Sequence, residues 1–147
     1  MIFYHEDLNH FRLKDSNIEY EDISSFLKTC EISFINEPTR FRKSFKIFLK
    51  NKAYAISPLI DIRYKMTITA KNNNTLICMQ IGNTARFHSD LLKVMHMYNK
   101  NRELQVIFIV PEKPNGNRAF FEKSVTEIKL YNNIITLPIR VISINHE

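Results

Sequence analysis

Three side chains that could act together lie in a β-rich stretch in the middle of the chain. Side chains alternate along a strand, so Cys78 and Gln80 share one face of the run Thr75 to Ile81. Asp61 belongs to the preceding alternating run, 59–69, and this predicts a polar sheet face with a carboxylate, an amide and a thiol. On periodicity alone, an ordinary half-solvated sheet face explains the same pattern.

A basic segment precedes these runs. Residues 40–52 contain six Lys or Arg and no acid, with Phe side chains repeating on the other side of a predicted helix. The segment is either a solvated helix face or a surface that contacts phosphates. The net charge of +6 and the pI near 9.4 favour a polyanionic partner. The residues expected to bind are Arg40, Arg42, Lys43, Lys46 and Lys50.

Further polar residues follow the second β-rich run. Asn83 or Thr84 is suited to capping a helix, and for Asn83 this use competes with a role in catalysis or base contact. Arg86 and Lys93, in the same predicted helix, are candidates for phosphate contacts. His88 and His96 are two turns apart, which is too far for a metal pair of the i, i+4 type.

The elements that must position these residues suggest an α/β domain. The runs 59–69 and 75–81 predict an antiparallel hairpin, and strands near 104–110 and 139–144 predict parallel pairing around a helix. A helix is expected from a capping box at Ser16 and Glu19 through apolar positions as far as Phe34, before Pro38 ends it. Further helices are expected over residues 40–51, from about 84 to 98, and from 118 to 131. The expected architecture is a mixed central sheet, with the hairpin joined to parallel strands, flanked by helices.

The composition indicates one folded unit. A chain of 147 residues with 44% hydrophobic residues is large enough to bury a core, so we expect a single domain over 1–147. The first ten residues lack a secretory pattern, and no apolar run of about 18 residues occurs. These features predict a soluble, cytoplasmic protein that does not enter a membrane. Cys30 and Cys78 lack CxxC spacing and are expected to be reduced.

Several strings in the second half of the chain, from about Asn74 to Ile144, resemble a known family. The strings NTLICMQIGN, QVIFIVPEK and LPIRVISI are similar to the core of the BglII-type restriction endonucleases, a branch of the PD-(D/E)xK nucleases. The resemblance implies a restriction-endonuclease-like fold in minimal form, with an Asp and a Glu that hold Mg2+ and a Gln beside the Glu. It implies that Gln80 fills the Gln position, and it is compatible with a homodimer.

This sequence departs from the family pattern at the metal ligands. Cys78 stands where the metal-binding Glu is expected, and a buried thiol is a poor ligand for a hard cation. Asp61 is the candidate metal ligand, but it lies 17 positions before Cys78. Counting outward from the turn at 71–74, Thr67 is nearer to Cys78 than Asp61 is, unless a bulge or a longer hairpin returns Asp61. The candidate catalytic residues are therefore Asp61, Cys78 and Gln80.

The resemblance and the departure together predict a protein that binds double-stranded DNA, with nuclease activity that is lost or weak. One alternative is an active Mg2+-dependent type II deoxyribonuclease that uses Asp61, Gln80 and a carboxylate recruited from elsewhere, such as Asp90. A second alternative is a viral or plasmid-borne protein-interaction module that reuses the fold. Salt-dependent DNA affinity and metal-dependent cleavage would separate the three.

Overall fold

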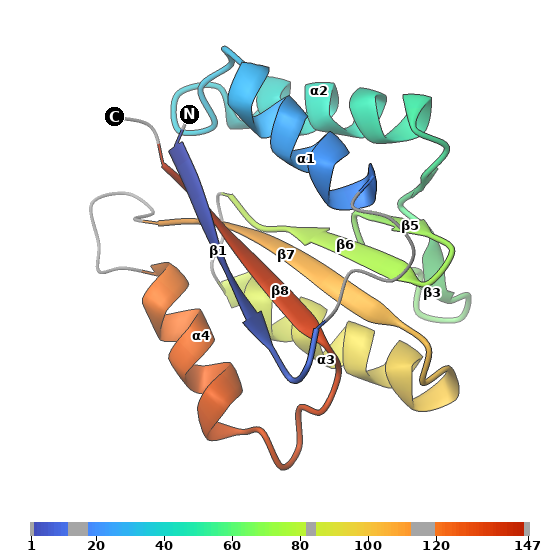
Figure 1. Cartoon of the computed structure of the whole chain (residues 1–147). Helices are drawn as coiled ribbons and strands as arrows, with labels where there is room; N and C mark the ends of the chain where they lie inside the picture. Colours follow the sequence, from blue (N-terminus) through green and yellow to red (C-terminus); the bar gives the residue numbers. More distant parts are fainter. Residues whose placement is uncertain (1, 12–17, 82–84, 113–119, 146–147) are drawn as a thin grey trace.

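The computed structural model describes residues 2–11, 18–81, 85–112 and 120–145. These residues form a six-stranded sheet in the order β1-β8-β7-β6-β5-β2, with two helices on each face (Figure 1). A separate two-stranded sheet, β3-β4, is also present. The mixed α/β architecture confirms the predicted fold class.

The centre of the large sheet is parallel, as the apolar runs predicted. Strand β6 (Thr75–Met79) pairs in parallel with β7 (Gln105–Pro111), and β7 pairs in parallel with β8 (Ile139–Asn145). Every residue of β6 and β7 is buried, because helices cover both sheet faces. The residue that directly follows β6, Gln80, is thus carried by the buried centre of the sheet.

Strand β1 (Ile2–Leu8) was not expected from the sequence. It pairs with β8 antiparallel over its whole length, from Ile2 opposite Asn145 to Leu8 opposite Ile139. The Arg140 guanidinium donates to both carboxylate oxygens of Asp7, at 2.6 and 2.7 Å, and joins the two strands. An N-terminal segment therefore closes the outer edge of β8.

The helices divide into two pairs, one for each sheet face. Helices α1 (Ile18–Thr29) and α2 (Pro38–Asn51) cover one face, and α3 (Ala85–Lys100) and α4 (Phe120–Leu130) cover the other (Figure 1). Alternation along β6 sends Ile77 and Met79 into the first core, and Leu76 and Cys78 into the second. Each helix pair thus has its own hydrophobic core.

Two helix boundaries differ from the expectations. Pro38 is in the first turn of α2 rather than before it, because Pro lacks a donor that a first turn would leave unused, and Glu37 is the N-cap. Helix α1 ends at Thr29, short of the expected Phe34. Ser16 of the expected capping box lies outside the described residues, as do Asn83 and Thr84.

The expected long hairpin 59–69/75–81 is wrong in its first arm. Residues 59–69 fold back on themselves, with β3 (Leu59–Asp61) antiparallel to β4 (Met66–Thr67). The partner of β6 is the short strand β5 (Ala70–Asn72), whose outer neighbour is β2 (Ala55–Ile56).

The turn between β3 and β4 explains the break. The Asp61 carboxylate accepts hydrogen bonds from the backbone N–H groups of Arg63 and Tyr64, and Lys65 has a positive φ of 51°. An Asp that bonds to amides two and three residues ahead stabilises a turn. Alternation of side chains cannot distinguish such a doubled-back segment from one long strand.

Candidate functional site

Gln80 lies directly after β6, where the parallel strands leave the core. Its backbone N–H donates to the carbonyl of Ile109 at 2.9 Å, and this bond holds the end of β6 against β7. Its side-chain amide donates to Oδ2 of Asp90, a residue of α3 that is 4% exposed. The Gln80 amide is therefore oriented by a buried carboxylate.

Lys93 completes the coordination of that carboxylate. Its Nζ donates to Oδ1 of Asp90 at 2.9 Å and to the backbone carbonyl of Thr67 at 3.1 Å. The side chains of Lys93 and Asp90 are 18% and 5% exposed, so the ion pair is largely shielded from solvent. Each Asp90 oxygen thus has a donor, one cationic and one neutral.

These residues line a cleft of about 300 Å3, here called the Gln80 cleft. Its walls come from the β4-β5 connection, the end of β6, and the facing sides of α2 and α3. Four lining residues are cationic, and among the described lining residues Asp90 is the only acid. The charged and amide side chains of the Gln80 cleft are Arg42, Lys46, Gln80, Arg86, Asp90 and Lys93.

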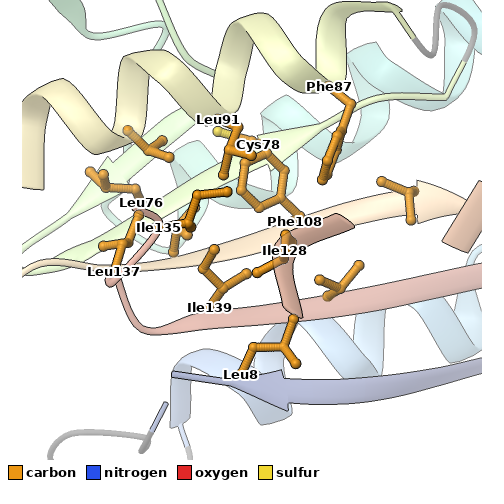
Figure 2. Packing of buried hydrophobic residues seen from close by; sticks show 14 of the residues in the cluster. Leu8, Leu76, Cys78, Phe87, Leu91, Phe108, Ile128, Ile135, Leu137 and Ile139 are labelled. Atoms are coloured by element: carbon orange, nitrogen blue, oxygen red, sulfur yellow. The ribbon is translucent and has the colours of Figure 1, made fainter. Parts of the chain in front are cut away.

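Cys78 lies beneath the Gln80 cleft and does not line it. The side chain shares a sheet face with Gln80, as predicted, but it packs in the core with Phe87, Leu91 and Phe108 (Figure 2). Burial, and then the nearby charge of Asp90, raise the pKa of the Cys78 thiol well above its ordinary value. Cys78 is therefore a neutral core residue near pH 7.

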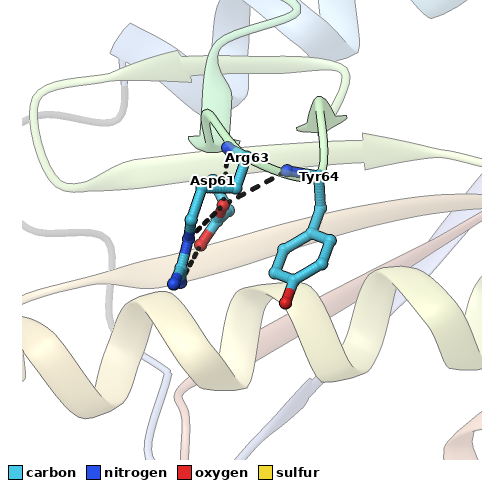
Figure 3. Close-up of polar contacts among 3 residues, drawn as sticks. All are labelled: Asp61, Arg63 and Tyr64. Atoms are coloured by element: carbon cyan, nitrogen blue, oxygen red, sulfur yellow. Dashed lines mark hydrogen bonds and ion pairs between the residues drawn. The ribbon is translucent and has the colours of Figure 1, made fainter.

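Asp61 lies in a different hollow, here called the Asp61 pocket, of about 320 Å3. Its carboxylate accepts from the Arg63 side chain at 3.0 Å and from the Arg63 and Tyr64 backbones (Figure 3). The hydrogen bond from Arg63 is the main cause that lowers the pKa of Asp61. Lys93 lines both hollows, but Asp61 does not line the Gln80 cleft.

Two threonines, Thr67 and Thr69, line the cleft with Gln80, where the resemblance implied a metal-binding Asp. Strand β5 pairs with β6 in the register Ala70 opposite Ile77, and beyond it Thr69 Oγ1 accepts from the N–H of Met79 at 3.0 Å. Thr67 and Thr69 both line the Gln80 cleft. Of the two residues proposed for the Asp position, Thr67 is therefore the one near Gln80.

The basic face of α2 extends the cationic surface beyond the Gln80 cleft. A wider hollow of about 680 Å3, here called the α2 groove, is lined by Arg42, Lys43, Lys46 and Lys50 with the apolar side chains of Ile47, Tyr54 and Ile56. Arg42 and Lys46 line both the groove and the cleft. Arg40 lines neither and pairs with Glu37 at 2.8 Å. Arg86 lines the cleft, whereas Asn83 lies outside the described residues.

Sequence reasoning gave too little weight to Asp90 and Lys93. Phe87, Asp90, Leu91 and Val94 are the buried residues of α3, and their spacing marks one helical face. A carboxylate on an apolar face is unusual unless it is paired, and Lys93 follows at i+3. A carboxylate on the apolar face of a predicted helix, with a lysine three residues later, was therefore the sequence signal for this buried ion pair.

The residues of the Gln80 cleft do not match the needs of Mg2+. This cation prefers several carboxylate or carbonyl oxygens in near-octahedral geometry. Among the described residues that line this cleft Asp90 is the one carboxylate, and both of its oxygens already accept hydrogen bonds. Within the described ranges, no group of three or more His, Cys, Asp or Glu is placed to hold a metal ion.

Fold and topology define the class: the chain has a restriction-endonuclease-like fold. Its structure is similar to the crystal structure of the restriction endonuclease BglII complexed with a DNA 16-mer, with a TM-score of 0.81 and 15% sequence identity. The match covers 100% of this chain and 79% of that chain. At this identity the likeness shows the fold alone. No protein-family model and no curated protein matches the sequence.

A membrane-spanning role finds no support in the helices. None of the helices in the described part of the chain is long and apolar enough to cross a bilayer.

Proposed function

We propose that this chain binds double-stranded DNA through the Gln80 cleft and the α2 groove, and that its nuclease activity is lost or weak. One observation carries the proposal: four cationic side chains gather in the Gln80 cleft around a single carboxylate that is already ion-paired. The excess positive charge suits phosphate groups. The site therefore favours binding of a polyanion over metal-assisted hydrolysis.

The shape of the basic surface supports a contact with an extended polyanion. Arg42 and Lys46 belong to both hollows, so the positive surface continues from the cleft along α2 to Lys43 and Lys50. Lys43, Lys46 and Lys50 are exposed and can reach successive phosphates. Contacts of this kind give affinity and register on DNA without reading its sequence.

The fold supports DNA as the polyanion. The similar structure of the restriction endonuclease BglII was solved as a complex with a DNA 16-mer. The same fold here presents a cationic surface over α2 and the end of β6. Fold and charge thus favour the same partner class.

The loss of activity is supported by the fates of the three candidate catalytic residues. Gln80 is in the cleft, but Cys78 is buried below it as a thiol, and Asp61 is held by Arg63 in the Asp61 pocket. Hydrolysis in this superfamily needs a cation that activates water and stabilises the developing charge. A cleft with one ion-paired carboxylate is a poor site for that cation.

One observation favours an active Mg2+-dependent deoxyribonuclease as the second candidate. The carboxylate of Asp90 contacts Gln80, and an active enzyme would need such a carboxylate recruited from elsewhere in the chain. Such an enzyme would also require Asp61 to leave Arg63 and reach the Gln80 cleft, and Lys93 to release Asp90. Cleavage that depends on Asp61 would identify this case.

DNA binding is tested by the salt dependence of affinity for a duplex. The variant Arg42→Gln/Lys43→Gln/Lys46→Gln should bind more weakly and lower the slope of log K against log salt by about 2 to 3, because three phosphate contacts are removed. Fluorescence anisotropy at several salt concentrations measures both quantities. A control variant, Lys100→Gln/Arg102→Gln/Lys123→Gln, removes three exposed charges elsewhere.

The two variants together decide the result. If the folded triple variant and the control have equal slopes of log K against log salt, α2 is not part of the DNA interface. If the unmodified chain shows no salt-dependent affinity for duplex DNA at all, the proposed function is wrong and a protein-interaction module replaces it. For cleavage, incubation of the unmodified chain with plasmid DNA and Mg2+ should leave the DNA intact, and robust cleavage abolished by Asp61→Asn would establish the enzyme instead.

A further inference from the structure

We infer that Lys93 is the built-in cation of the Gln80 cleft and takes the place that a divalent metal would need. The inference deepens the proposed function and rests on it for the identity of the bound phosphate. The contacts of Lys93 with Asp90 and Thr67 can be tested by divalent-cation binding without DNA.

The contacts of Lys93 Nζ are those of a bound cation. The ammonium group bridges a carboxylate oxygen of Asp90 at 2.9 Å and a backbone carbonyl oxygen of Thr67 at 3.1 Å. These are the oxygen types that hard divalent cations use as ligands. Lys93 comes from α3, whereas Thr67 is in β4, so the ammonium also links two elements that are far apart in the sequence.

Burial distinguishes the Lys93–Asp90 ion pair from an ion pair on the surface. Its two side chains are 18% and 5% exposed. Ion pairs on the surface contribute little to stability because solvent screens them, whereas removal of one partner of a buried pair is strongly destabilising. The other oxygen of Asp90 accepts from the amide of Gln80. A metal could bind Asp90 only by displacing a lysine that already compensates its charge.

The consequence for the proposed function is metal-independent binding. Because Lys93 already neutralises Asp90, the cleft needs no Mg2+ to offset this carboxylate before a phosphate binds. Arg42, Lys46 and Arg86 line the same cleft and provide further donors. In this inference an internal ion pair stands where a carboxylate-bound metal would be, and the other three cations of the cleft supply the positive charge for a phosphate.

The test is divalent-cation binding to variants of the ion pair. Mn2+ is the probe, because it binds such oxygen ligands and its free form is quantified by electron paramagnetic resonance. The unmodified chain should bind no Mn2+ at the cleft, and millimolar Mn2+ should leave its Tm unchanged. Lys93→Met removes the ammonium while keeping a similar side-chain stem, and leaves a buried carboxylate without a counter-charge. Its Tm should fall by roughly 10 °C.

Added Mn2+ should then restore part of that loss. With the metal at about a hundred times its Kd, the Tm of Lys93→Met should rise by roughly 5 to 10 °C. The double variant Asp90→Asn/Lys93→Met should be more stable than Lys93→Met and should not respond to Mn2+. Lys100→Met, which changes an exposed lysine of the same helix, is the matched control and should behave as the unmodified chain.

Three outcomes decide the inference. If Lys93→Met fails to fold without metal, recovery of folding in Mn2+ supports the inference and no recovery overturns it. A folded Lys93→Met that binds no Mn2+ also overturns it. Mn2+ binding by the unmodified chain that is lost in Asp90→Asn would show that Lys93 does not exclude the metal. None of these results depends on DNA, so a failure of the proposed function is seen separately.

Discussion

At the scale of single residues, Cys78 and Gln80 show how one strand face serves two purposes. The two side chains are two positions apart, Cys78 in β6 and Gln80 directly after it, and both point toward the α3 side of the sheet. Cys78 is still inside the sheet and meets Phe87 and Phe108, whereas Gln80 lies past the strand end and meets Asp90 and the cleft. The distance from the core, rather than the residue types, separates their roles.

A carboxylate at position 78 should therefore destabilise the chain instead of restoring a metal site. We expect Cys78→Glu to lower the free energy of unfolding by about 3 to 5 kcal/mol at neutral pH, because it buries a charge close to Asp90. Burial and Asp90 should raise the pKa of this new Glu above its unfolded value. The deficit should be small below the unfolded pKa and grow as pH rises through the folded pKa.

Urea unfolding at several pH values measures this effect. Cys78→Gln is the neutral control of similar size, and its loss of stability should not depend on pH in the same range. If Cys78→Glu were as stable as Cys78→Gln at neutral pH, position 78 would open to the cleft and to solvent, contrary to its packing here.

At the scale of elements, the β3-β4 hairpin is the part of the site region that depends most on a few polar bonds. Five residues, Leu59 to Asp61 and Met66 to Thr67, make this small sheet, and the exposed side chains of the hairpin include Leu59, Ile62 and Tyr64. Little apolar burial holds it, so the bonds to Asp61 matter more than they would in a core element.

Asp61 should accordingly control the local order of this hairpin. In Asp61→Ala the amide hydrogens of Arg63 and Tyr64 should exchange faster with solvent, because both lose their acceptor. The pKa of Asp61 is lowered in the folded chain, so its contribution is present above the unfolded value of 3.8 and is lost as pH falls through the folded pKa. Hydrogen exchange followed by NMR measures both effects.

Asp61→Asn is the informative comparison, since Asn keeps a turn acceptor but loses the ion pair with Arg63. It should retain more protection at these two amides than Asp61→Ala does. Unchanged exchange in both variants would mean that the turn does not need the carboxylate.

At the scale of the whole molecule, the two ends of the described chain form one edge of the large sheet. The N-terminal β1 pairs with the C-terminal β8, and the Asp7–Arg140 pair joins them. At the other edge, β5 and β2 extend the sheet toward α2 and its basic face (Figure 1). The sheet thus ends in different ways at its two sides, with the cationic surface at the β5 side.

We expect two chains to act together on DNA. A duplex presents two antiparallel backbones, and a homodimer with two-fold symmetry would present the Gln80 cleft and α2 groove of each chain to one of them. Sedimentation equilibrium should give twice the mass of 17.5 kDa, at least with duplex DNA bound. A 1:1 complex of one chain with one duplex at saturation would contradict this prediction.

The sequence by itself determined the central architecture and the basic helix. The largely apolar runs of β7 and β8 and the 3.6-residue pattern of α2 and α3 are local signals, because burial on two faces or on one stripe dictates residue type directly. The position of Gln80 at the end of β6 followed from the same pattern. The Cys at position 78, where the resemblance implies a carboxylate, was also visible in the sequence.

Only the tertiary structure decided which side chains meet in the cleft. The pairing of β1 with β8 and the contact of Lys93 with Thr67 join segments that are distant in the chain. The doubling back of 59–69 and the contact of Asp90 with Gln80 depend on how neighbouring elements turn and pack. Periodicity reports which face of an element is buried, but it carries no information on what that face meets. The contacts of Asp90 with Gln80 and of Lys93 with Thr67, on which our inference about the cleft rests, are a property of this packing.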